Sequence, residues 1–186
     1  QQRDRSGMAL DIFGTYRFDN VWKPEVTLEY VHFSGEEDLS NWTASDYEGW
    51  NALYRGKFWT AYADFREFVS ATGDLYDQAG STNSQFFQVK GAIKPLEDLL
   101  LEASATFLWT DETIHTGAVT LGSDAYLASG ERSNDLGWEF DFSATYDYTE
   151  DVSFGLLTGW FVPGDYFVSP NDDVATDIVS SVKVSF

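Results

Sequence analysis

The sequence predicts an all-β protein, an antiparallel β-barrel that crosses a membrane. Three observations predict it: polar and apolar residues alternate along seven segments, each segment is long, and short connections alternate with long ones. Strands of globular proteins are typically about five or six residues long, whereas a tilted strand needs about 9–11 residues to cross a bilayer. Short turns at one end and long loops at the other are typical of outer-membrane barrels. We expect residues 1–186 to form a single barrel segment.

The alternation is clearest in WEFDFSATYDY, residues 138–148, where every even position is apolar or aromatic and every odd position is polar. Such a period of two predicts a strand with two different faces. In chain order, the pattern predicts strands at 8–18, 24–33, 85–95, 98–111, 138–148, 151–165 and 175–186. Phe13 interrupts the polar face of the first strand. The polar face of each strand is expected to meet water and the apolar face to meet lipid.

The connections form two groups. Tight turns are predicted at 19–24, 94–98 and 148–152, and extracellular loops at 34–84, 111–136 and 164–174. The loop at 34–84 has room for two more strands, for instance around 56–68. Aromatic residues that could form interfacial belts cluster at strand ends: Trp22, Trp109, Trp138, Tyr148, Trp160 and Tyr166.

Composition excludes several functions. The net charge of −20 argues against nucleic-acid binding. The chain has no cysteine, which excludes thiolate metal sites and a cysteine nucleophile. Its two histidines offer neither a multi-histidine metal site nor a Ser–His pair, so we expect no enzyme and no cofactor. A soluble β-sandwich or barrel would alternate in the same way, but strand length, loop asymmetry and the terminal Phe186 favour the membrane barrel.

The direction of the strands predicts an incomplete barrel. The C-terminus of an outer-membrane barrel lies in the periplasm, which places the tight turns there as well. The first and last predicted strands then run in the same direction and cannot pair antiparallel. Because a closed antiparallel barrel needs an even number of strands, we expect the missing strands upstream or on another chain.

Alternation also predicts which side chains line a pore. In the last strand, Ile178, Val182, Val184 and Phe186 are expected to face lipid. The mostly acidic opposite face would favour cations or neutral solutes, since wall charges set pore selectivity; simple solvation of each position is the alternative. The pore-lining candidates are Asp11, Arg17, Glu25, Glu29, Lys90, Glu102, Glu139, Asp141, Asp147, Asp177 and Lys183.

Two loops hold further candidates. Arg55 and Lys57, in ALYRGKFW, could form a constriction that contacts sugar or carboxylate groups, or belong to a loop packed by its own aromatics. Asp172, Asp173 and Asp177 are weak Ca²⁺ candidates because hard cations prefer clustered oxygens. Their spacing matches no known loop motif, so we expect a solvated loop and no metal.

Longer stretches resemble a known family. They are LGWEFDFSATYDYTEDVSFGLLTGWFVPGDYF, DDVATDIVSSVKVSF, YRFDNVWKPEVTLEYVHFSGE and FFQVKGAIKPLEDLLLEASATFLWTDE. In their order and spacing they are similar to the alginate-export family of outer-membrane porins. The resemblance covers the chain from residue 8 onward and implies a barrel of about eighteen strands, with this chain as its C-terminal seven. The acidic face departs from the basic pore lining of the alginate exporter.

The resemblance implies a porin in the outer membrane of a Gram-negative bacterium, with its C-terminus in the periplasm. It would pass hydrophilic, charged or saccharide solutes by passive diffusion. The alternative is a scaffold whose barrel sheathes or docks a partner protein. Expected partners are membrane lipid, lipopolysaccharide, a small hydrophilic solute and the outer-membrane assembly machinery, which would recognise Phe186.

Overall fold

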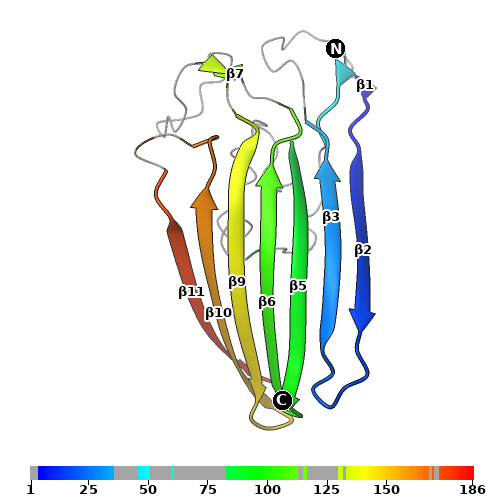
Figure 1. Ribbon diagram of the computed structural model, residues 1–186, viewed down its shortest axis with the longest axis vertical. Helices are drawn as coiled ribbons and strands as arrows, with labels where there is room; N and C mark the ends of the chain where they lie inside the picture. Colours follow the sequence, from blue (N-terminus) through cyan, green and yellow to red (C-terminus); the bar gives the residue numbers. More distant parts are fainter. Residues whose placement is uncertain are drawn as a thin grey trace.

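One antiparallel sheet of seven strands forms the body of the molecule (Figure 1). The computed structural model describes residues 4–35, 46–50, 60, 83–112, 115–116, 130–131, 133–167, 169 and 172–186. The seven strands are β2 (Ala9–Arg17), β3 (Glu25–Phe33), β5 (Ser84–Leu96), β6 (Leu99–Trp109), β9 (Asp135–Asp147), β10 (Val152–Pro163) and β11 (Ala175–Val184). Their spatial order, β11-β10-β9-β6-β5-β3-β2, follows the chain, so the sheet is a meander. All seven predicted strands are confirmed.

The two ends of the sheet differ, as the sequence predicts. The turns that join β2 to β3, β5 to β6 and β9 to β10 lie at the end where the chain terminates (Figure 1). The turn expected at 94–98 is shorter than predicted, because β5 continues to Leu96 and β6 begins at Leu99. At the opposite end, where the long connections attach, β3, β6 and β10 end and β5, β9 and β11 begin (Figure 1). We call these the turn end and the loop end.

Two small strand pairs accompany the main sheet. β1 (Asp4–Arg5) pairs parallel with β4 (Asp46–Tyr47), and β7 (His115–Thr116) pairs antiparallel with β8 (Gly130–Glu131). Apart from residue 60, the stretch 56–68 lies outside the described residues, so the extra strands considered there stay untested. The described part of the chain contains no helix of the length and apolarity that a membrane span requires.

The register of the main sheet sorts the side chains onto two faces. Cross-strand partners share a face because their Cβ atoms point to the same side of the pleat. One row that crosses the sheet consists of Leu28, Val89, Ala105, Phe140, Trp160 and Thr176. The adjacent row consists of Glu29, Gln88, Thr106, Glu139 and Phe161. We call the side of the first row the apolar face and the side of the second the polar face.

Large hydrophobic side chains are exposed along the apolar face. Ile12 is 58%, Leu156 is 44% and Ile178 is 69% exposed, and these residues lie on strands from one edge of the sheet to the other. Soluble monomers seldom expose contiguous apolar patches larger than a few hundred Å². A face of this kind is stable where lipid replaces water, as on the outside of a membrane barrel.

Near the loop end, the polar face carries apolar side chains. A buried cluster there contains Val31, Phe33, Phe86, Leu108, Leu136, Phe161 and Tyr166. Tyr166 is 3% exposed, so its predicted place in an exposed aromatic belt is wrong. The sequence signal for this cluster is a loss of alternation, since YVHF, FF and FLW set apolar residues on both faces of their strands.

A bulge in β9 supplies one member of this cluster. The pairing of β6 with β9 shifts between Leu108 and Trp109, which pair with Gly137 and Asp135, so Leu136 is skipped. Gly137 has φ of 113°, and a Cβ there would collide with the carbonyl oxygen of Val162. Glycine is required because other residues rarely adopt this conformation. The bulge leaves Leu136 fully buried in the cluster.

Candidate functional site

The polar face collects every residue that the sequence predicts as pore-lining. The register places all of them on this one face, whichever strand carries them: Asp11, Arg17, Glu25, Glu29, Lys90, Glu102, Glu139, Asp141, Asp147, Asp177 and Lys183. This common face follows from alternation within each strand and from the register, because cross-strand partners point to the same side of the sheet. That these side chains line a pore stays a prediction.

A row of buried polar side chains crosses the middle of this face. Glu29 and Gln88 are each 4% exposed, and Thr106 and Glu139 are fully buried. They are cross-strand neighbours, and Gln88 Nε2 donates a hydrogen bond to Thr106 Oγ1 at 2.9 Å. The two glutamates are therefore covered positions of the polar face, whereas alternation alone could predict only their side of the sheet.

A pocket of about 380 Å³ lies on the polar face, on the turn-end side of this row. We call it the wall pocket. Its polar lining includes Thr60, Lys90, Glu102, Ser104, Asp141 and Ser143. Three predicted pore-lining residues, Lys90, Glu102 and Asp141, therefore meet at one site. Sequence reasoning missed the serines, because a serine on the polar face of a strand carries no signal of its own.

Short contacts connect the polar groups of the wall pocket. Lys90 Nζ lies 2.6 Å from Glu102 Oε1, and Ser143 Oγ donates a hydrogen bond to Glu102 Oε2 at 3.3 Å. Ser104 Oγ donates to Asp141 Oδ2 at 3.2 Å. The Lys90 side chain is 42% exposed and that of Glu102 is 27% exposed. A partly exposed ion pair of this kind stabilises the fold by roughly 0–1 kcal/mol, so its main effect is on the electrostatics of the pocket.

Thr60 shows that part of a long connection reaches the polar face. It belongs to the segment between β4 and β5, is 8% exposed and lines the wall pocket. The predicted loop 34–84 therefore places at least this residue against the wall. Arg55 and Lys57, the predicted constriction residues, lie outside the described residues.

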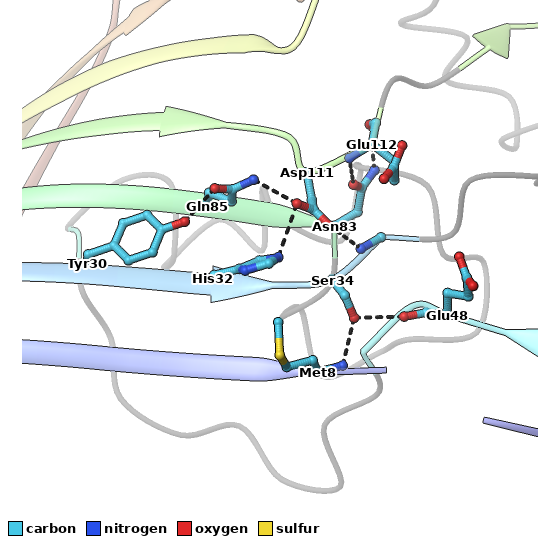
Figure 2. A network of polar contacts seen from close by, with 10 residues as sticks. Met8, Tyr30, His32, Ser34, Glu48, Asn83, Gln85, Asp111 and Glu112 are labelled. Atoms are coloured by element: carbon cyan, nitrogen blue, oxygen red, sulfur yellow. Dashed lines mark hydrogen bonds and ion pairs between the residues drawn. The ribbon is translucent and has the colours of Figure 1, made fainter. Parts of the chain in front are cut away.

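Asn83 joins the ends of two long connections at the loop end (Figure 2). Its Oδ1 accepts a hydrogen bond from the Glu112 amide at 2.7 Å, and its Nδ2 donates to the Glu112 carbonyl at 3.2 Å. Its own amide donates to the Ser34 carbonyl at 3.2 Å. Ser34 and Asn83 lie on either side of the connection from β3 to β5, and Glu112 follows β6. These contacts therefore hold three chain segments together.

Asp111 is the second centre of this network (Figure 2). Its Oδ2 accepts a hydrogen bond from the Gly35 amide at 3.0 Å. Its Oδ1 accepts one from Gln85 Nε2 at 2.7 Å and lies 3.1 Å from His32 Nε2. Tyr30 in turn donates its hydroxyl hydrogen to Gln85 Oε1 at 2.6 Å. We call the contacts of Asn83 and Asp111 the loop clamp. Sequence reasoning missed it because its members lie at the ends of three strands without a shared spacing.

The weak Ca²⁺ candidates do not assemble. Within the part of the chain that the structure describes, no three His, Asp or Glu side chains gather as metal ligands. Asp177 pairs with Gly159 on the polar face, while Asp172 and Asp173 precede β11 and are exposed.

Long antiparallel strands with one exposed apolar face and one polar face define the wall of a membrane β-barrel. A family model described as "Alginate export" matches residues 1–180. The match covers nearly the whole chain, and the chain belongs to this family. The resemblance read from the strand and turn motifs is thereby confirmed, as are the outer-membrane location and the transport role that the family implies. A search of curated proteins found no match.

Proposed function

We propose that this chain forms part of the wall of a water-filled channel that passes hydrophilic solutes through the outer membrane by passive diffusion. The observation that carries the proposal is the polar face itself, with Thr60 of a long connection lying against it. A wall of hydroxyls, amides and charges replaces part of the hydration shell of a solute. The apolar face would meet membrane lipid and lipopolysaccharide.

The proposed orientation sets the C-terminus and the turn end in the periplasm. The supporting observation is that all three tight turns share an end of the sheet with the C-terminus (Figure 1). The connections 34–84, 111–136 and 164–174 are then extracellular, and the first two narrow or gate the channel. Phe186, whose side chain is fully exposed, is the proposed recognition point for the assembly machinery.

The proposed selectivity follows from the acidic residues of the polar face. Acidic wall positions outnumber basic ones among the predicted pore-lining residues, and negative walls attract cations. The scaffold alternative needs a polar face that is open to a partner protein. Thr60 and the buried cluster at the loop end occupy part of that face, which favours the channel.

Single-channel recording on the full-length protein tests the proposal. We expect stepwise conductance in planar lipid bilayers and, in a salt gradient, a reversal potential of the sign that marks cation preference. Anion preference would contradict the acidic-wall argument. Absence of conductance from protein shown to be folded and inserted would contradict the channel and favour the scaffold.

A further inference from the structure

We propose that the wall pocket is a binding subsite for a neutral saccharide unit. The inference rests on the proposed function, because a pocket on the polar face can meet a passing solute only if that face lines the channel. The volume of the pocket, about 380 Å³, is within the range of roughly 300–1,000 Å³ found for small-molecule sites. The pocket therefore has room for a ligand as well as water.

The polar groups of the pocket match the hydroxyl groups of a sugar. A sugar hydroxyl both donates and accepts hydrogen bonds, and so does a serine or threonine hydroxyl, while a carboxylate accepts only. The pocket presents two such pairs on neighbouring strands, Ser104 with Asp141 and Ser143 with Glu102. The Glu102 carboxylate can accept a sugar hydroxyl, and the oxygen of either serine can bind another. Asp141 orients Ser104, because its second carboxylate oxygen, Oδ1, is buried. Thr60, Thr145 and Ser181 also line the pocket.

The pocket also has an apolar side. Leu157 and Val179 are cross-strand partners on the polar face and line the pocket. They can pack against the C–H groups of a sugar ring, which carries its hydroxyls at the rim. Gly155 lies in the next row, and an added Cβ there would collide with Ser181 Oγ. Glycine at this position leaves the side-chain space to the Ser181 hydroxyl and keeps the wall recessed.

The electrostatics favour a neutral sugar over an acidic one. The ammonium of Lys90 lies 2.6 Å from Glu102 Oε1, so a uronate carboxylate would have to compete with Glu102 for that charge. A neutral sugar needs no free cation, because hydroxyls bind well to the carboxylate–serine pairs. The open pocket offers only a few contacts, which suits a channel in which a solute must enter and also leave.

The test uses maltotriose as the neutral probe and trigalacturonate as the acidic probe on single channels of the full-length protein. We expect maltotriose to block the current in a concentration-dependent manner and to bind more tightly than trigalacturonate. Replacing both serines (Ser104→Ala with Ser143→Ala) should weaken maltotriose binding about tenfold, because two hydrogen-bonding groups are lost. Thr15→Ala is the matched control: its hydroxyl bonds to Thr27 at 2.8 Å on the same face, outside the pocket.

The outcomes separate the two proposals. A conducting channel in which maltotriose produces no block, or blocks the double serine variant as well as the wild type, would overturn the saccharide site and leave the channel standing. Tighter block by trigalacturonate would overturn the neutral ligand class. If the protein does not conduct, saturation-transfer NMR with maltotriose in detergent still decides: signal lost in the double variant supports the site, and no signal from the wild type refutes it.

Discussion

Two adjacent leucines in β10 lie in two different environments. Leu156 pairs with Ala144 and Ser180 on the apolar face and is 44% exposed. Leu157 pairs with Ser143 and Val179 on the polar face and is half-buried. The residue type is the same, so the register alone decides which solvent each side chain meets. A slip of one residue would exchange the two faces along the whole strand.

The two faces of the sheet differ least at the loop end, where the polar face carries the buried cluster. Phe86 and Phe87 are adjacent there, with Phe86 in the cluster at 3% exposed and Phe87 on the apolar face. Phe86→Ala should lower the free energy of unfolding by about 3–5 kcal/mol, as expected for a buried phenylalanine. Phe87→Ala should cost less than half as much, because lipid can fill the vacated space. Urea unfolding in vesicles measures both, and equal losses would contradict the assignment of a packed core to the polar face.

A charged side chain introduced in the middle of β10 distinguishes the lipid environment of one face from the water environment of the other. Leu156→Arg should lower the free energy of unfolding by about 2–4 kcal/mol, the cost of arginine at the bilayer midplane. Leu157→Arg is the matched control and should cost under about 1 kcal/mol, since it places the same charge near water. The same unfolding experiment compares them. A larger loss for Leu157→Arg would reverse the two faces.

The loop clamp lies at the loop end of the sheet, where β3 and β6 end and β5 begins. Asp111→Ala removes the hydrogen-bond acceptor for the Gly35 amide and Gln85, together with the close contact to His32 Nε2. Losing hydrogen bonds to a charged group should cost about 1.5–3 kcal/mol locally, and the Gly35 amide should exchange its hydrogen more than tenfold faster. Asp111→Asn keeps one carbonyl acceptor, so its Gly35 exchange rate should lie between that of Asp111→Ala and that of the wild type. Unchanged protection of Gly35 in Asp111→Ala would show that the clamp does not hold this segment.

The smallest effect on stability is expected inside the wall pocket. Glu102→Gln should change the free energy of unfolding by less than about 1 kcal/mol, because the pair with Lys90 is partly exposed. It should nevertheless shift the reversal potential toward anions, since a negative wall charge is removed. Glu150→Gln, in the exposed turn between β9 and β10, is a control outside the predicted pore-lining positions. A reversal potential that does not move would show that the Glu102 charge is screened from the channel.

The sequence predicted the strands, their faces and the two ends of the sheet because alternation is a local signal. It could not predict that Leu136 and Tyr166 join the buried cluster, since they reach it through a bulge and a loop. Nor could it predict the wall pocket, which depends on Ser104 and Ser143 standing beside acidic partners on other strands. Thr158 lies on the apolar face despite its hydroxyl, which donates to the Asp177 carbonyl at 3.0 Å. Such tertiary contacts carry no periodic signal.

The measurement that tests the two faces most directly is a cysteine scan of residues 176–183 in β11. Residues 1–186 contain no cysteine, so within this part of the protein each introduced thiol reports only its own position. In the membrane-inserted full-length protein, a charged water-soluble thiol reagent should label Asp177→Cys, Val179→Cys, Ser181→Cys and Lys183→Cys. The even-numbered positions, including Ile178→Cys and Ser180→Cys, should react only with a lipid-soluble reagent. Uniform labelling by the charged reagent, or labelling of the even positions alone, would contradict a wall with water on one face and lipid on the other.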